Sequence, residues 1–64
     1  MPDLFVLTIV YCLGLDCNTP QFHEEFIWPI PFTTLGECGA AGIVAEEVLK
    51  SQGKKIIDNR CEGK

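Results

Sequence analysis

The chain opens with a long apolar run. Leu4 to Cys12 is rich in β-branched and aromatic residues and is largely apolar at both odd and even positions. Successive side chains of a strand point to opposite faces, so a run of this kind is typical of a strand that is covered on both sides. The pattern therefore predicts a central strand over Leu4 to Cys12.

A second pattern alternates from Phe22 to Phe32. Its even positions are mostly large and apolar, and comprise Phe22, Glu24, Phe26, Trp28, Ile30 and Phe32. A period of two predicts a strand whose even face is buried. Pro29 and Pro31 remove two backbone donors from the same side of this strand, so we expect it at the edge of the sheet. The segment before it, which contains Gly14, Asp16, Asn18 and Pro20, has the composition of a loop.

The third pattern has the spacing of a helix. Thr34 and Glu37 match a capping box, in which each side chain accepts a hydrogen bond from the other residue's free backbone N–H, so the helix is predicted to begin at Leu35. Apolar or small residues then recur every three or four positions, at Leu35, Cys38, Ala41, Gly42, Ala45, Val48 and Leu49. Gly53 is expected just after the last turn.

The remaining segment, Lys54 to Glu62, reads as a third strand carrying Ile56 and Ile57. The expected order is therefore β-β-α-β, in one small α+β domain that covers residues 1–64. A right-handed crossover through the helix places the third strand beside the first. We expect a three-stranded antiparallel sheet of order 2-1-3, with the single helix on one face.

One helix covers only one face of such a sheet. Because the first strand is apolar on both faces, the uncovered face is expected to offer Phe5, Leu7, Ile9 and Tyr11. Monomeric proteins rarely leave a large apolar patch exposed. We therefore expect this face to pack against a second copy of the chain, giving a homodimer or a higher oligomer.

Composition supports a small domain whose core needs disulfides, a metal or a partner subunit for stability. The chain has 64 residues, of which 47% are hydrophobic and 22% are charged, with a formal net charge of −4. A chain this short buries only about 60% of the surface exposed by its unfolded form. The apolar content excludes intrinsic disorder, and the acidic balance argues against a nucleic-acid partner.

The four cysteines, Cys12, Cys17, Cys38 and Cys61, allow three disulfide pairings. Cys38 and Cys61 are the candidate pair, because the third strand is expected to run back toward the start of the helix. A disulfide there would contribute about 3 kcal/mol. The alternatives are free thiols or a zinc site, although C-x4-C followed by two isolated cysteines differs from the paired C-x2-C knuckles of zinc sites. We expect neither a metal site nor a cofactor.

Signals of catalysis are weak. His23 is the only histidine and lacks the second histidine of a metalloprotease helix. We expect no catalytic residues and a non-enzymatic protein. A thiol enzyme is the minor alternative, and it would require a cysteine with a depressed pKa.

Charge is distributed unevenly along the chain. Residues 1–49 contain seven acidic residues and no Lys or Arg, whereas residues 50–64 contain five basic and two acidic residues. Arg60, near the end of the last strand, is expected beside the helix start, where it and the exposed N–H groups of Gly36 and Gly39 could bind an anion such as a phosphate. Lys54 and Lys55 are the other candidate residues for this anion site. Glycines in a helix are costly, and close approach of the helix to the sheet or to another subunit is the alternative explanation for them.

The segment from Phe32 to Ala41, FTTLGECGAA, followed by Arg60-Cys61, resembles short uncharacterised proteins that are often encoded by phages and prophages. Those proteins have two strands, a helix that opens with a cysteine after a Thr or Ser cap, and a last strand with a second cysteine. Cys12 and Cys17 lie outside the pattern. The resemblance implies a small acidic oligomer in counter-defence, which blocks a host protein or sequesters an anionic, nucleotide-like ligand.

The first apolar run also bears on localisation. It lacks a preceding Lys or Arg, carries Asp3 instead, and is not followed by a small-residue cleavage site, so we do not expect a secretion signal. It is also shorter than the about 20 residues of a membrane span, so no membrane partner is expected. We expect a cytoplasmic protein, in the host cytoplasm if it is phage-encoded. The alternative is a disulfide-stapled structural or interaction module that is secreted or periplasmic.

Overall fold

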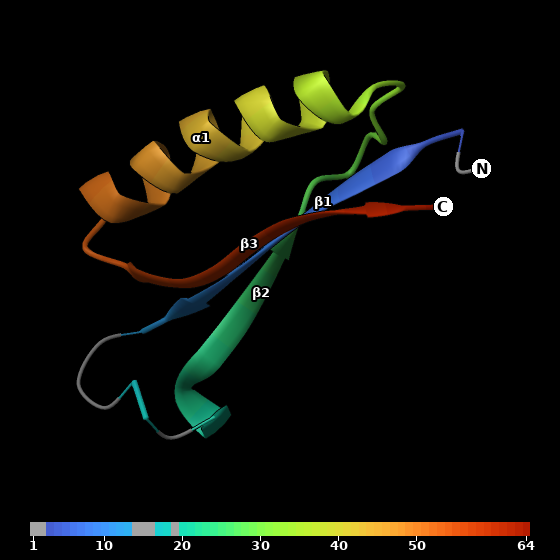
Figure 1. The fold of residues 1–64 in the computed structure, drawn as a ribbon. Helices are drawn as coiled ribbons and strands as arrows, with labels where there is room; N and C mark the ends of the chain where they lie inside the picture. The colour runs from blue at the N-terminus through green and yellow to red at the C-terminus, as the bar shows by residue number, and fades with distance from the viewer. Residues whose placement is uncertain (1–2, 14–16, 19) are drawn as a thin grey trace.

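The computed structural model describes residues 3–13, 17–18 and 20–64, so the predicted first loop lies partly outside the described residues. The elements follow in the order β1 (Phe5–Cys12), a short 3-10 turn η1 (Pro20–Phe22), β2 (His23–Ile27), α1 (Leu35–Ser51) and β3 (Lys55–Gly63). Figure 1 shows α1 lying along one side of the sheet, over β3 and β1, while β2 extends away from it.

The sheet has the predicted topology. β1 is central and pairs antiparallel with both neighbours, in the order β2-β1-β3. Together with the single helix, this confirms an α+β fold of order β-β-α-β. The apolar character of β1 on both faces agrees with its central position.

Both ends of α1 match their sequence signals. The Thr34 hydroxyl accepts a hydrogen bond from the Glu37 N–H over 3.1 Å, and the helix begins at Leu35 as predicted. Gly53 follows the helix with a φ of 83°, a left-handed conformation that favours glycine. Its N–H donates to the carbonyl of Lys50, and this bond closes the last turn.

β2 is shorter than the predicted strand. The Trp28 N–H still donates to the Leu7 carbonyl over 3.0 Å, but the next contact with β1 is the pair of backbone hydrogen bonds between Phe5 and Phe32, each 2.8 Å long. Pro29 and Pro31 lie between these two contacts, where the ladder is interrupted. The predicted edge position is confirmed, because β2 lies at one end of the strand order.

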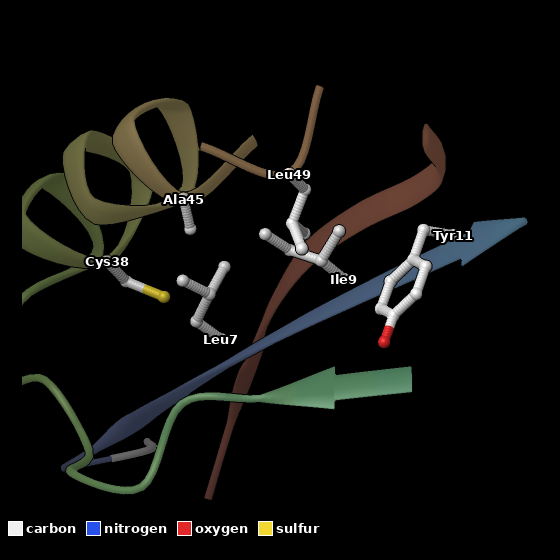
Figure 2. Packing of buried hydrophobic residues seen from close by; sticks show 6 residues of the cluster. All are labelled: Leu7, Ile9, Tyr11, Cys38, Ala45 and Leu49. Atoms are coloured by element: carbon white, nitrogen blue, oxygen red, sulfur yellow. The ribbon is translucent and has the colours of Figure 1, made fainter. Parts of the chain in front are cut away.

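The core lies between α1 and the odd-numbered side chains of β1. Figure 2 shows the core residues, which are Leu7, Ile9, Tyr11, Cys38, Ala45 and Leu49. The prediction that Phe5, Leu7, Ile9 and Tyr11 line an open face is therefore wrong. Cross-strand partners share a face, and Ile9 lies opposite Phe26, which is partly buried and packs against the core.

The uncovered face of the sheet carries the even positions of β1, among them Val6, Thr8 and Val10. The cross-strand partners of these residues on β3 are the charged Glu62, Arg60 and Asp58. Thr8 is only 7% exposed although no helix covers it. This face is thus a narrow apolar strip beside a charged row, rather than the broad apolar surface expected for an oligomer interface.

Candidate functional site

An apolar groove runs between α1 and β2. It has a volume of about 310 Å³ and is lined by Phe26 and Trp28 on the sheet side and by Val44 and Val48 on the helix side. Val44 is 62% exposed and Val48 is 49% exposed. The groove exists because α1 packs on β3 and β1, leaving the apolar side chains of β2 without a helix above them.

The aromatic side of the groove is a connected row of rings. Phe26 and Trp28 meet edge to face, with ring centroids 6.1 Å apart. Trp28 in turn contacts Phe32, with centroids 5.8 Å apart. Such contacts hold each ring in place beyond the effect of area burial. The sequence prediction that the even face of this segment is buried is confirmed only in part. Phe26 and Trp28 pack against the core and yet border an open groove, and Phe22 and Ile30 are exposed.

One end of the groove is polar. The Tyr11 hydroxyl donates to Glu24 Oε2 over 3.0 Å. This hydrogen bond raises the pKa of Tyr11, as do burial and the negative charge of Glu24. Lys54 Nζ lies 4.9 Å from the centroid of the Tyr11 ring and donates to Gln52 Oε1 over 3.0 Å. In the part of the chain that the structure describes, no carboxylate forms an ion pair with Lys54, so its charge is available to a ligand.

The predicted anion site is not assembled. Cys61 faces α1, where it is bonded to Cys38, and the adjacent Arg60 therefore points to the opposite face of the sheet. There the Arg60 guanidinium donates to Glu62 and, over 2.7 Å, to Asp58. These hydrogen bonds raise the pKa of Arg60. Arg60 is thus neutralised by two carboxylates and lies on the other side of the sheet from the helix start.

The other predicted anion-site residues are divided between the two ends of α1. Gly36 and Gly39 lie in the first turns of α1 with open space around them. Lys54 lines the α1–β2 groove. Lys54 and Lys55 also border together a shallow depression of about 700 Å³, which Glu46 and Lys50 line as well. Of the predicted set, only Lys54 belongs to the candidate site.

Gly42 shows why one of the helix glycines is needed. A Cβ atom at this position would lie 2.9 Å from Asn59 Oδ1 and 3.2 Å from Leu7 Cδ1. The Asn59 amide donates to the Gly42 carbonyl and to Glu46 Oε2, each over 3.1 Å. The close approach of helix and sheet therefore explains Gly42, whereas no described residue lies close enough to explain Gly36 or Gly39.

This difference gives a matched pair of variants. Gly39→Ala is expected to raise the free energy of unfolding by about 1 kcal/mol, because alanine has the higher helix propensity. Gly42→Ala is expected to lower it by about 1 kcal/mol, because overpacking displaces Asn59 and outweighs that gain. Urea unfolding of dilute protein measures both, and a stabilised Gly42→Ala variant would contradict the close contact.

The four cysteines form two disulfides. The predicted Cys38–Cys61 pair is confirmed, with Cα atoms 6.2 Å apart. Cys12 and Cys17 form the second pair, with Cα atoms 5.5 Å apart. Zinc binding or thiol catalysis would need thiolates, which these pairs do not provide. Among the described residues there is also no group of three or more His, Cys, Asp or Glu placed to hold a metal ion.

The Cys12–Cys17 pair was not predicted from the sequence, although the short spacing between the two residues was a usable signal. His23 reinforces the turn, because its Nε2 donates to the Cys17 carbonyl over 2.7 Å. His23 lies opposite Cys12 in the sheet. The only histidine therefore has a structural contact at this end of the sheet.

No protein-family model, curated protein or solved structure matches the chain. Within the described residues, no helix combines the length and the apolar content needed to cross a membrane.

Proposed function

We propose that this chain is a non-enzymatic binding protein whose α1–β2 groove takes an apolar, acidic segment of a partner protein. The observation that carries the proposal is the groove itself, with Trp28 and Val48 on opposite walls and Lys54 at one end. Aromatic residues that border such a groove are frequent binding hot spots. An apolar side chain next to a carboxylate matches this combination of walls and charge.

The size of the groove favours a protein partner over a nucleotide. Its volume of about 310 Å³ lies at the low end of the range of about 300 to 1,000 Å³ for small-molecule pockets. A nucleotide would also need several donors for its phosphates, whereas Lys54 is the one cationic residue among those that line the groove. Of the two roles implied by the phage resemblance, blocking a host protein is therefore the better match.

The two disulfides support an oxidising compartment as the working location. Disulfides persist in secreted and periplasmic proteins and are rare in the cytoplasm. We therefore propose an oxidising compartment outside the cytoplasm as the location of the binding protein, and the cytoplasmic location expected from the sequence is the alternative. A purely structural module of the same compartment is the second candidate, which the disulfides alone favour. In a purely structural module the groove would bind nothing, whereas in a binding protein it would hold the partner.

The test uses a dye that resembles the proposed occupant. Anilinonaphthalene sulfonate combines fused aromatic rings with one negative charge, and Trp28 is the only tryptophan, so energy transfer from Trp28 reports bound dye and the variants show where it binds. Val48→Asp is expected to weaken dye binding at least about tenfold, because it places a charge in the apolar wall. Ile43→Asp is the matched control, since Ile43 is exposed on the same helix but does not line the groove.

A second comparison isolates the charge. Lys54→Gln is expected to weaken binding of the sulfonate dye and to leave binding of the uncharged N-phenylnaphthylamine unchanged. Equal dye binding by the wild type and Val48→Asp would exclude the groove as the site. Absence of binding by the wild type would favour the structural module.

A further inference from the structure

We infer that two copies of this chain pair through the outer edges of their β3 strands, so that the two sheets become one continuous antiparallel sheet. The outer edge of β3 lies away from the α1–β2 groove, so pairing there does not depend on what the groove binds. The interface expected from the sequence was the uncovered face of the sheet. The proposed interface is instead the edge of β3.

The outer edge of β3 has backbone groups available for pairing. In the described part of the chain, β1 is the only strand beside β3. The Lys64 N–H donates inward to the Leu4 carbonyl over 2.8 Å, so the N–H groups of Gly63, Cys61 and Asn59 alternate outward. The Asn59 N–H donates to the Asp58 carboxylate over 2.9 Å, so pairing with a second copy would replace this hydrogen bond.

The other edge of the sheet, formed by β2, is less suited to pairing with a second strand. β2 has five residues, whereas β3 has nine. The segment after β2 contains Pro29 and Pro31, which have no N–H to donate. Prolines of this kind discourage pairing between edges, and β3 carries none. Of the two described sheet edges, β3 is therefore the one that can pair over a long stretch with an approaching strand.

A bulge limits which part of β3 can pair. The register with β1 shifts between Val10 and Tyr11, which pair with Asp58 and Ile56, so Ile57 is the extra residue. Bulges bend and twist a strand locally, so the regular part of the edge begins after Ile57. An antiparallel two-fold pairing that uses the whole segment 58–64 is centred on Cys61.

The charged side chains of β3 favour the same register. With Cys61 at the centre, Arg60 lies opposite Glu62 of the second copy, and Asp58 lies opposite Lys64 of the second copy. With Arg60 at the centre, Asp58 would face Glu62 of the second copy and the two Arg60 side chains would face each other. Opposite charges directly across a ladder stabilise it, and like charges destabilise it. The row of charges on β3 is therefore self-complementary in one register.

The position of α1 is compatible with this pairing. Neighbouring strands lie about 4.8 Å apart. Because α1 packs over β3 and β1, the two helices would lie about 10 Å apart across the two-fold axis, close to the usual packing distance. Glu46 and Lys50 mark the β3 side of the helix, and the exposed Leu35, Gly39 and Ile43 precede them at helical spacing. The second helix thus gives Gly39 a reason to lack a side chain.

The test is a pair of charge reversals read by sedimentation velocity over a range of concentrations. The wild type is expected to dimerise. Arg60→Glu and Glu62→Arg are each expected to weaken the dimer about tenfold to hundredfold, because each places like charges opposite one another at two positions. An equimolar mixture of the two variants is expected to form a heterodimer of wild-type strength, since every opposing pair is then of opposite charge.

Gly63→Pro provides a variant that does not alter charge. It removes only an outward N–H, so it is expected to weaken the dimer while near-ultraviolet circular dichroism shows an intact fold. A wild type that stays monomeric at all accessible concentrations would overturn the inference. So would a dimer that is unaffected by these variants, or a mixture of the two charge variants that fails to associate.

Discussion

Replacement of Cys38 and Cys61 by alanine is expected to leave the chain largely unfolded at about 37 °C. The disulfide joins residues that are 23 positions apart, and closing a loop of this length contributes about 3.5 kcal/mol on the chain-entropy estimate. A domain of 64 residues has a total stability of only about 3 to 10 kcal/mol. Cys38 is also fully buried, so its sulfur contributes to packing as well.

The matched control removes the other disulfide. Cys12 and Cys17 are five positions apart, and alanine at both is expected to cost about 2 kcal/mol. Urea unfolding followed by Trp28 fluorescence, without reductant, compares the two double variants. A loss below about 1 kcal/mol for the Cys38–Cys61 variant would show that this disulfide does not hold the helix on the sheet.

The second large effect is expected at Leu7. This residue is fully buried beneath α1, and Leu7→Ala is expected to lower the free energy of unfolding by about 2 to 5 kcal/mol through lost burial and the cavity left behind. Val6→Ala is the control, because Val6 lies on the uncovered face and is half-buried. Its expected cost is about 1 kcal/mol. A Val6 variant less stable than the Leu7 variant would reverse the assignment of faces.

The local signals in the sequence were sufficient for the elements and their order. Thr34 with Glu37 fixed the helix start, and Gly53 marked its end. The prolines at 29 and 31 indicated an edge strand. These signals act within a few residues, because capping and proline geometry are decided by the nearest backbone groups.

Local signals of this kind could not predict which face of β1 packs against the helix. β1 is apolar at odd and even positions alike, so alternation carried no information there. The face is set by the register with β2, which places Ile9 opposite Phe26. Register depends on contacts between distant segments, and a shift of one residue exchanges the two faces. For the same reason, Arg60 was expected near the helix start but lies on the other face of the sheet.

The groove was missed for a related reason. Val48 belongs to the apolar spacing of the helix and was expected in the core. Instead, α1 packs over β3 and β1, and Val48 remains about half exposed. The Cys38–Cys61 disulfide joins the first turns of α1 to β3 and thereby keeps the helix away from β2. That lateral position is a property of the tertiary structure, and helical periodicity does not encode it.

We propose that both disulfides are present in the compartment where the protein works, so that α1 is tethered to β3 there. Disulfide mapping tests it on protein taken from that compartment, with free thiols blocked during extraction. Cleavage after glutamate separates residues 1–24, which contain Cys12 and Cys17, from residues 38–46 and 48–62, which contain Cys38 and Cys61. We predict an internal disulfide in the first peptide and a covalent link between the other two. Four blocked thiols, or a link from the first peptide to either of the others, would show that these two disulfides do not form there.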